Sequence, residues 1–170
     1  MSVPIAIIAA VAKNGVIGAA GGLPWRVKAD LRKFRSITMG KPLIMGRRTF
    51  ETLPRVLDGR DSVVVTRQAG FSTPGAFVAE NLEAALTLAQ KLAAGRATDE
   101  VFIGGGGEIY RQAFPMADRL YITHISAEPA GDTVLPEIRA EDWTEVSREP
   151  IPKSEGDTAE AEHVVYARRR

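Results

Sequence analysis

One carboxylate in the sequence occupies a position where an apolar, core-facing residue is expected. In the segment KADLRKFRSIT (28–38), Asp30 shares a predicted helix face with Phe34 at i+4 and Ile37 at i+7. A buried carboxylate without a partner is costly, and burial raises its pKa. Such a group suits a ligand site, where hydrogen-bond donors of a bound molecule meet it. The alternative is an acidic residue near a helix N-terminus, which the helix dipole favours.

The stretch GAAGGLPW (18–25) precedes this helix. Its glycines predict a flexible loop that ends in the apolar Leu-Pro-Trp segment. A buried acid beneath a flexible apolar loop is typical of a ligand cleft with a lid.

Four consecutive glycines form a second unusual feature. The segment VFIGGGGEIY places Gly104 to Gly107 between an apolar run and a helical pattern. A strand followed by glycines and a helix is an arrangement in which free backbone N–H groups face an anion. The spacing matches neither the GxGxxG fingerprint with its later acidic residue nor a motif ending in GK[ST]. A plain turn is the alternative.

Cationic and hydroxyl side chains follow two further predicted strands. Arg47, Arg48 and Thr49 come after one of them, with Thr49 expected to cap a short helix, and Thr66 and Arg67 come after the other. Ligands of open α/β sheets collect at the carboxyl ends of strands, and arginine binds phosphate oxygens bidentately. With the strand that precedes the glycine run, three strand ends carry glycines, arginines or hydroxyls, and together they predict a multiply phosphorylated ligand. Arginines on a solvated sheet edge are the alternative.

Strand and helix patterns alternate along the segments that must position these residues. Short β-branched runs predict strands at 5–12, 42–46, 62–66, 100–104, 120–126 and 162–169. Helical periodicity predicts a helix at 28–38 with Leu31, Phe34 and Ile37 on one side, and another at 108–114. It predicts a third helix at 81–95, with Asn81 as its N-cap and Gly95 as its stop. The pattern predicts an α/β fold with a largely parallel sheet covered on both faces. The last third lacks intervening helices and predicts an antiparallel edge, with 148–163 as a long hairpin loop.

Composition excludes several classes of function. The chain has 170 residues, 45% hydrophobic and 25% charged, which suits one domain over residues 1–170. With 22 Lys and Arg against 21 Asp and Glu, charge favours neither nucleic acid nor a membrane as partner. There are no cysteines, and His124 and His163 lack metal-ligand spacing, so we expect no metal. We expect a hydrogen-bonded structural role for His124, and a cytoplasmic protein, because the N-terminal apolar run is interrupted too early to span a membrane.

Together these residues resemble the dihydrofolate reductase family. The similarity runs from Ile5 to nearly the last predicted strand, and it is carried by IAAVAKNGVIG, LPW followed by Asp30, DLRKF, IMGRRTFETLP, LDGR, IGGGGEIY, YITHI and GDTVLP. Each motif is weak alone, but all occur in the family order at near-family spacing. The resemblance implies a central, twisted, mostly parallel sheet of about eight strands with an antiparallel C-terminal edge and about four helices on both faces.

The resemblance also implies an activity, namely NADPH-dependent reduction of 7,8-dihydrofolate to 5,6,7,8-tetrahydrofolate in one-carbon metabolism. Hydride would pass from nicotinamide C4 to pterin C6 while water protonates N5, with Asp30 tuning the ring, so catalysis would rest on orientation and electrostatics. A monomer that binds dihydrofolate and antifolate inhibitors is implied. The implied catalytic residues are Asp30, Leu23, Trp25 and Thr123, with Thr123 hydrogen-bonded to Asp30.

The family match extends residue by residue to two binding sites. Substrate binding is implied for Ile8, Asp30, Leu31, Phe34, Leu53, Arg55, Leu57, Arg60, Gly104 and Thr123, with Arg60 forking the glutamate α-carboxylate. Cofactor binding is implied for Ala10, Val16, Ile17, Gly18, Ala19, Ala20, Gly21, Gly22, Gly46, Arg47, Arg48, Thr49, Thr66, Arg67, Gly105, Gly106, Gly107, Glu108, Ile109 and Tyr110. Residues 19–23 would form the lid. The arginines would surround the 2′-phosphate and pyrophosphate, which favours NADPH over NADH.

The glycine run both follows and departs from the family. The family's Gly-Gly cis peptide is expected between Gly105 and Gly106, where side chains would also block the cofactor. Gly104 stands where the family usually has a branched aliphatic or aromatic residue that closes the pocket. A register with one inserted glycine is the alternative, although DEVFI would then pair poorly with its strand.

Two other functions compete with this interpretation. One is a reductase of the same fold that acts on a phosphorylated pyrimidine of riboflavin synthesis, but Asp30, Phe34 and Arg60 argue against it because that substrate has no glutamate tail. The other is a non-catalytic pterin- or nucleotide-binding protein. Nothing in the motifs suggests a loss of turnover.

Overall fold

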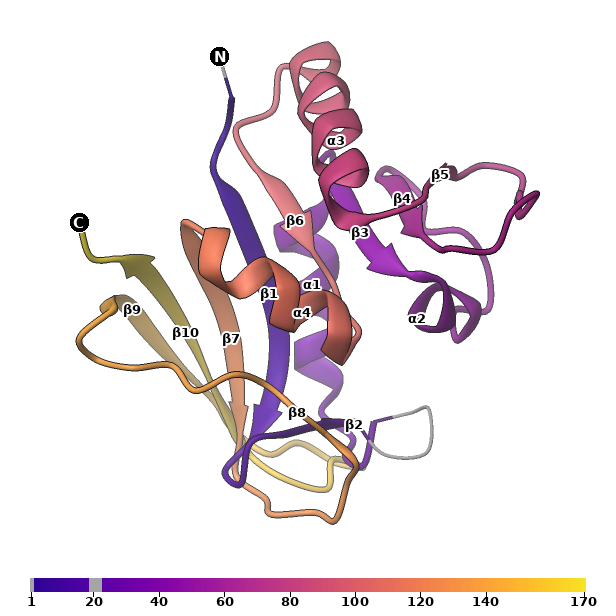
Figure 1. Cartoon of the computed structure of the whole chain (residues 1–170). Coiled ribbons are helices and arrows are strands. Elements are labelled where there is room, and N and C mark those ends of the chain that lie inside the picture. Colours follow the sequence, from indigo (N-terminus) through magenta and orange to yellow (C-terminus); the bar gives the residue numbers. More distant parts are fainter. Residues whose placement is uncertain (1, 19–22) are drawn as a thin grey trace.

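One eight-stranded sheet runs through the computed structural model, which describes residues 2–18 and 23–170 (Figure 1). The strand order is β5-β4-β3-β6-β1-β7-β10-β9. The strands are β1 (Ile5–Ala12), β3 (Pro42–Gly46), β4 (Asp61–Val65), β5 (Phe77–Ala79), β6 (Val101–Ile103), β7 (Arg119–Ile125), β9 (Trp143–Ile151) and β10 (Ala161–Arg168). All pairs from β5 to β7 are parallel, and β10 pairs antiparallel with β7 and β9. The prediction of a mostly parallel sheet with an antiparallel C-terminal edge is confirmed.

Helices cover both faces of this sheet, as predicted. The helices are α1 (Lys28–Thr38), α2 (Arg47–Glu51), α3 (Leu82–Arg96) and α4 (Gly107–Ala113), with a 3₁₀ turn η1 (Phe114–Met116) after the last. Strand alternation separates the faces, since Ile7 joins the core cluster of α3 and α4, and Ile8 joins that of α1 and α2. In Figure 1, α3 and α4 lie in front of the sheet and α1 lies behind it. Among the described helices, none is long and apolar enough to cross a membrane.

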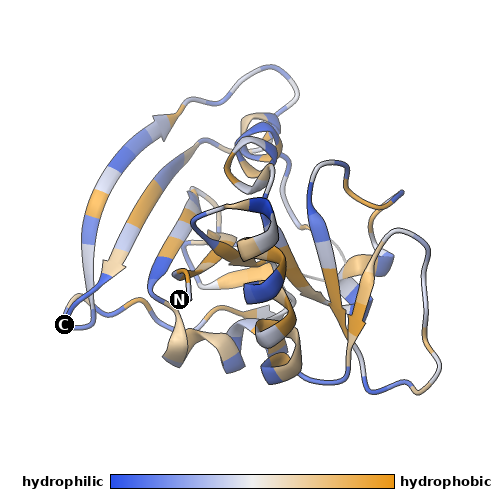
Figure 2. Ribbon diagram, turned by 90° about the horizontal axis from the view of Figure 1, so that it is seen from above, coloured by the Kyte–Doolittle hydropathy of each residue, from blue (hydrophilic) through white to orange (hydrophobic). Residues whose placement is uncertain are grey.

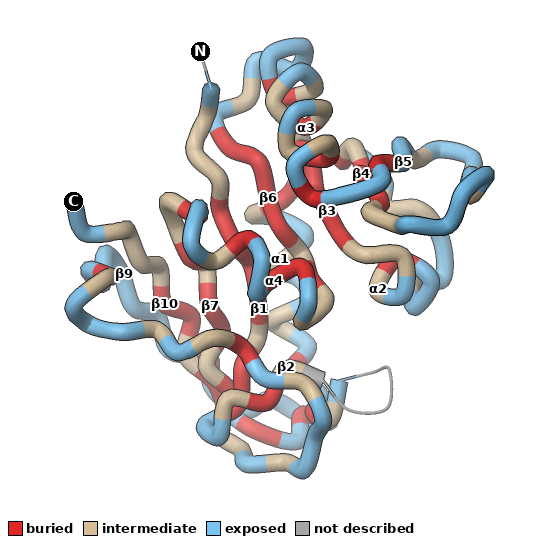
Figure 3. Tube along the Cα trace, viewed as in Figure 1, coloured by how far each residue is buried: buried red, intermediate tan, exposed pale blue. Residues whose placement is uncertain are grey.

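The central strands are apolar along most of their length and lie in the buried interior (Figures 2 and 3). Val63, Val64 and the whole of β6 are 0% exposed. A strand covered by helices on both faces needs apolar side chains on both sides, which explains these continuous β-branched runs. The rigid sheet therefore holds the strand ends that carry the predicted site.

Three local predictions differ from the structure. Leu31 is 63% exposed, because it lies about 100° around the helix from Asp30, away from the face that Phe34 and Ile37 share. Thr49 lies inside α2, whose N-cap is Gly46, so its expected capping role is wrong. The predicted hairpin loop is shorter, because β9 and β10 continue pairing up to Ile151 and Ala161.

Helix α3 begins as predicted but ends later. The Asn81 side chain accepts a hydrogen bond from the Ala84 N–H at 2.7 Å. The helix passes through Gly95 to Arg96, and Ala97 takes the left-handed conformation with φ 54°. Thus the glycine lies two positions before the residue that needs its conformational freedom.

We expect two substitutions to remove this mismatch between residue type and backbone conformation at the end of α3. Ala97→Gly should raise the free energy of unfolding by about 1 kcal/mol, because glycine adopts the left-handed conformation without a Cβ clash. Gly95→Ala should raise it by about 0.5–1 kcal/mol, since the site is helical and open. Denaturant unfolding measures both. Gly40→Ala, in equally open space but at φ +79°, is the control and should destabilise; stabilisation there would contradict this explanation.

Candidate active site

The carboxyl ends of β4, β3 and β6 lie side by side. Gly46 at the end of β3 pairs with Val65 at the end of β4, and Ile44 pairs with Ile103 at the end of β6. Backbone N–H groups of Gly46 and Gly104 donate to the carbonyls of Gly105 and Ile44, both at 2.8 Å. The three segments predicted to bind phosphate therefore start from neighbouring strands.

The glycine run carries a cis peptide between Gly105 and Gly106, as predicted from the family register. Each of its last three glycines closely approaches a side chain of the protein itself. A Cβ on Gly105, which has φ +102°, would lie 3.0 Å from the Tyr110 ring, and one on Gly106 would lie 3.1 Å from Thr49 Oγ1. A Cβ on Gly107 would overlap the Thr133 methyl group. The structure thus confirms that protein side chains closely approach the backbone of these glycines. The close approach of a cofactor to them stays a prediction.

Leu43 occupies the space beside Gly104. A Cβ on Gly104 would lie 3.0 Å from Leu43 Cδ1 and 3.7 Å from the Ile44 carbonyl. Leu43 is fully buried, in the cluster that also contains Ile8. The missing side chain at position 104 is therefore replaced by a neighbour on β3, which no sequence pattern indicated.

Asp30 on α1 meets Thr123 on β7. The Thr123 hydroxyl donates to Asp30 Oδ1 at 2.5 Å, and Thr123 is 2% exposed. Burial raises the pKa of the Asp30 carboxyl, and the Thr123 hydrogen bond offsets part of this increase. His163 on β10, which no motif singled out, places Nδ1 3.3 Å from Thr123 Oγ1. The available sequence signal was the spacing of Ala161, His163 and Val165, which lie two residues apart and therefore point to one face of the strand.

Several apolar side chains predicted to bind the substrate lie on the same face of the sheet as this carboxylate. Phe34, Leu53 and Leu57 are half-buried and pack against the cluster that contains Ile8. Leu23 and Leu31 are 55% and 63% exposed, which suits the rim of an apolar ligand site. Trp25 is buried, and its Nε1 donor has no hydrogen-bond partner within residues 2–18 and 23–170. Ala19, Ala20, Gly21 and Gly22 of the predicted lid lie outside the described residues.

Arg60 is buried rather than displayed on the surface. Its Nε donates to the Asp58 carbonyl at 2.9 Å and its Nη1 to Thr38 Oγ1 at 3.3 Å. The Arg60 side chain is 2% exposed, and burial lowers the pKa of its guanidinium. Arg55, in contrast, is exposed and has no hydrogen bond or ion pair to another described residue.

The residues predicted for the nicotinamide end also come together. Val16, Ile17 and Gly18 form β2 (Val16–Gly18), which pairs with β8 (Thr133–Val134). A Cβ on Gly107 would lie 4.0 Å from Ile17 Cδ1, and Ala10 pairs with Thr123. The next helix holds Ile109 and Tyr110 in the core, where the Tyr110 hydroxyl donates to the Ile8 carbonyl at 2.7 Å. Glu108 is exposed and pairs with Arg111.

At the adenosine end the three predicted arginines differ. Arg47 pairs with Glu51 at 3.0 Å, whereas Arg48 and Arg67 are exposed and have no ion pair with any residue in the described ranges. Thr66 Oγ1 accepts from the Gln68 N–H at 3.1 Å. A surface hollow here is lined by Thr66, Arg67, Gln68, Ala69, Gly70, Phe71, Val78, Ala79, Glu80, Ala84 and Leu88.

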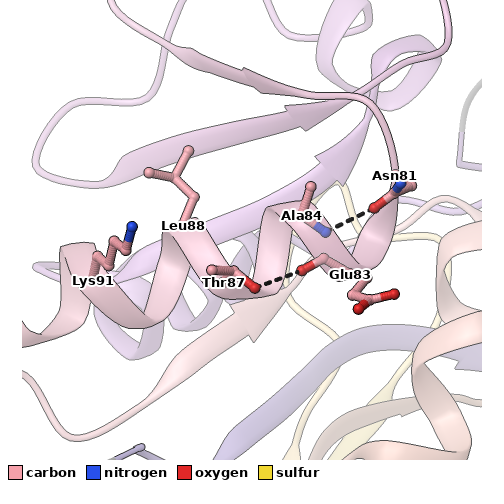
Figure 4. Close-up of a pocket in the computed structure, with 6 residues that line it drawn as sticks. All are labelled: Asn81, Glu83, Ala84, Thr87, Leu88 and Lys91. Atoms are coloured by element: carbon pink, nitrogen blue, oxygen red, sulfur yellow. Dashed lines mark hydrogen bonds between the residues drawn. The ribbon is translucent and has the colours of Figure 1, made fainter.

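A second hollow runs along α3 and contains none of the predicted site residues (Figure 4). Its polar groups already serve the helix, since Asn81 caps it and the Thr87 hydroxyl donates to the Glu83 carbonyl. We assign no chemistry to this hollow.

Comparisons with known proteins agree with this geometry. Residues 4–168 match the family described as dihydrofolate reductase. The chain is 42% identical over 166 residues to a dihydrofolate reductase type 3 from Salmonella typhimurium, covering 98% of this chain and 99% of that protein. It is 43% identical over 145 residues to a dihydrofolate reductase from Neisseria meningitidis, covering 85% and 86%.

The fold is similar to that of a solved relative. A dihydrofolate reductase from Enterococcus faecalis, complexed with NADP(H) and RAB-propyl, aligns with a TM-score of 0.88 and 32% identity. The alignment covers 98% of this chain and 97% of the other. From its sequence, its fold and the arrangement of its strand-end residues, this chain belongs to the dihydrofolate reductase family.

Proposed function

We propose that this chain is a dihydrofolate reductase that uses NADPH to reduce 7,8-dihydrofolate to 5,6,7,8-tetrahydrofolate, the supply for one-carbon metabolism. The Asp30–Thr123 pair carries the proposal, because it offers a half-buried carboxylate on the face of the sheet that the Ile8 cluster covers. We also propose that the chain acts as a one-domain monomer, and that antifolate inhibitors bind at the Asp30 site.

Asp30 would bind and orient the pterin. Oδ1 is engaged by Thr123, whereas Oδ2 has no partner among the described residues and is available to an N–H donor. The 2-amino-4-oxo ring presents paired N–H donors that suit a carboxylate. In the proposal, the ionised carboxylate stabilises positive charge as N5 is protonated, and water delivers that proton. Leu23, Leu31 and Phe34 would exclude bulk water from the ring.

The residues at the strand ends fit NADPH. When bound, NADPH supplies the hydride that pterin C6 accepts. Arg48 and Arg67 offer two guanidinium groups that form no ion pair with any described acidic residue. Such groups bind the dianionic 2′-phosphate that distinguishes NADPH from NADH. The Gly105–Gly107 backbone and Ile17 would hold the nicotinamide end.

A steady-state assay tests the proposed function directly. NADPH absorbance should fall only when dihydrofolate is present, and tetrahydrofolate should form in equal amount. Consumption with a phosphorylated aminopyrimidine and not with dihydrofolate would favour the riboflavin-type reductase instead. Tight binding of both ligands without turnover would favour a non-catalytic binding protein.

Cofactor choice gives a sharper prediction. Replacing Arg48 and Arg67 together by alanine should raise the KM for NADPH by roughly tenfold or more and leave the KM for NADH nearly unchanged. Solvent exposure and salt screening keep the effect near the lower end of the range for charge-assisted contacts. The control replaces Arg139 and Arg148, which are exposed arginines on other segments, and makes the same change in net charge. Equal weakening of both cofactors would instead assign the pair to the shared pyrophosphate.

A further inference from the structure

Four residues line up across the sheet beneath α1. Ala10 on β1 pairs with Thr123 on β7, Thr123 pairs with His163 on β10, and His163 pairs with Glu149 on β9. Residues directly opposite each other on neighbouring strands point to the same face. The row therefore leads from the predicted nicotinamide site, past the partner of Asp30, to the outer edge of the sheet.

Helix α1 contacts this row at two points, one turn apart. Asp30 accepts a hydrogen bond from Thr123 at 2.5 Å, and Lys33 Nζ pairs with Glu149 at 2.6 Å. His163 lies in the row between these two contacts and is 5% exposed. It is the buried titratable group closest in the row to the carboxylate that the proposed function needs.

The hydrogen bonds of the Thr123 hydroxyl determine whether His163 acts as donor or acceptor. A threonine hydroxyl has one proton and two acceptor positions. At 2.5 Å from Asp30 Oδ1, that proton points to the carboxylate. The contact of 3.3 Å between Thr123 Oγ1 and His163 Nδ1 then requires the imidazole to donate. Burial lowers the pKa of His163 to about 4, so at neutral pH its single proton must sit on Nδ1.

We propose that His163 is a positioning residue, which donates from Nδ1 to Thr123, aims the Thr123 hydroxyl at Asp30 and thereby stabilises the Asp30 carboxylate. The inference rests on the proposed function, because it concerns the carboxylate of that site. Two hydrogen bonds in series polarise one another, so the His163 donor strengthens the bond that Asp30 accepts. Without this donor, the hydroxyl is free to rotate and the ionised carboxylate loses part of its stabilisation.

Other titratable groups face this chain of hydrogen bonds from every element around it. Lys33 on α1 and His124 on β7 lower the pKa of His163, and Glu149 on β9 raises it. The Tyr121 ring lies 6.5 Å from the His163 ring. Burial and, to a smaller extent, the Asp30 charge raise the pKa of the Tyr110 phenol on α4. The Lys33–Glu149 ion pair presents opposite charges together, so its net influence on the pKa of His163 is small. The substitutions used in the test leave this ion pair intact.

The first measurement needs no substitution. In ¹⁵N NMR of the ligand-free protein at pH 7, His163 should be neutral with its proton on Nδ1. A proton on Nε2 would overturn the proposal, because Thr123 cannot donate to both Asp30 and His163. This outcome does not depend on catalysis.

The second measurement follows the Asp30 carboxyl carbon by ¹³C NMR in ligand-free variants. His163→Leu should raise the Asp30 titration midpoint by about half a pH unit, the scale of one modest hydrogen bond. His163→Asn is the matched control, because its amide nitrogen can take the place of Nδ1, and it should restore the wild-type midpoint. The acid limb of the kcat profile should move with the same midpoint, because the proposed mechanism needs the ionised Asp30 carboxylate.

A double-mutant cycle separates the proposed route from general packing. In a Thr123→Val background, His163→Leu should add no further shift. An equal shift in both backgrounds, or none in either, would overturn the role of His163. Failure of dihydrofolate turnover with the expected NMR shifts would instead overturn the proposed function and leave the positioning role standing.

Discussion

We expect Asp30→Asn to fold and to lower kcat at pH 7 by about 10²–10³-fold, the scale of a positioned ionisable group in catalysis. The amide keeps the shape of the side chain and still accepts from Thr123, but it lacks the charge that stabilises a protonated pterin. The loss should shrink at low pH, where more substrate already carries the N5 proton. Near wild-type turnover at pH 7 would remove Asp30 from the mechanism.

The same variant should be more stable than the wild type at neutral pH. Burial raises the pKa of Asp30 above its ordinary value of 3.8, so the folded protein binds this proton more tightly than the unfolded chain does. The stabilisation that protonated Asp30 contributes is fully present below pH 3.8 and is lost as the pH rises through the folded-state pKa. The difference between variant and wild type should therefore grow from acid to neutral pH in denaturant unfolding.

Asp58 provides a control of opposite sign. Arg35 donates two hydrogen bonds of 2.8 Å to its carboxylate, and they are the main cause that lowers the pKa of Asp58 to about 2. Stability from the ionised group is present above pH 3.8 and is lost as the pH falls through about 2. Asp58→Asn should thus destabilise slightly at neutral pH, since the pair is exposed. A rise in stability there would contradict the sign argument used for Asp30.

The second large effect concerns Arg60. We expect Arg60→Leu to raise the KM for dihydrofolate by about 10–150-fold, which corresponds to a lost charge-assisted pair of about 1.5–3 kcal/mol. The guanidinium is buried beside Thr38 and held by the Asp58 carbonyl, so it is pre-oriented and poorly screened. The affinity for NADPH should stay near its starting value, because only the glutamate tail loses a partner.

Two variants separate substrate binding from structure. Arg35→Leu removes the other arginine that pairs with Asp58 and should leave the KM for dihydrofolate unchanged. A substrate analogue without the glutamate tail should bind Arg60→Leu and wild type equally well. If NADPH affinity falls as much as dihydrofolate affinity, Arg60 supports the fold and does not select the substrate.

Local sequence patterns predicted much of this protein because their causes are local. Helix 28–38 has the predicted bounds, since its ends and periodicity are properties of a single segment. The central strands were evident because burial on both faces demands continuous apolar runs. The end of α3 was missed, since Ala97 adopts a conformation for which glycine is the usual residue. The family motifs also aligned Gly105 and Gly106 with the cis peptide.

The sequence by itself thus determined the longer helices, the central strands, the family and the orientation of Asp30 on its helix. The family resemblance implied Thr123 as the partner of that carboxylate, but only the tertiary structure decided what lies behind Thr123. Thr123 and His163 are 40 residues apart, and they meet because β7 and β10 pair in one register among several that local patterns allow. In the same way, Leu43 on β3 fills the space beside Gly104, the residue after β6. Such contacts depend on how distant segments pack together, and that information is not contained in the propensity or periodicity of any one segment.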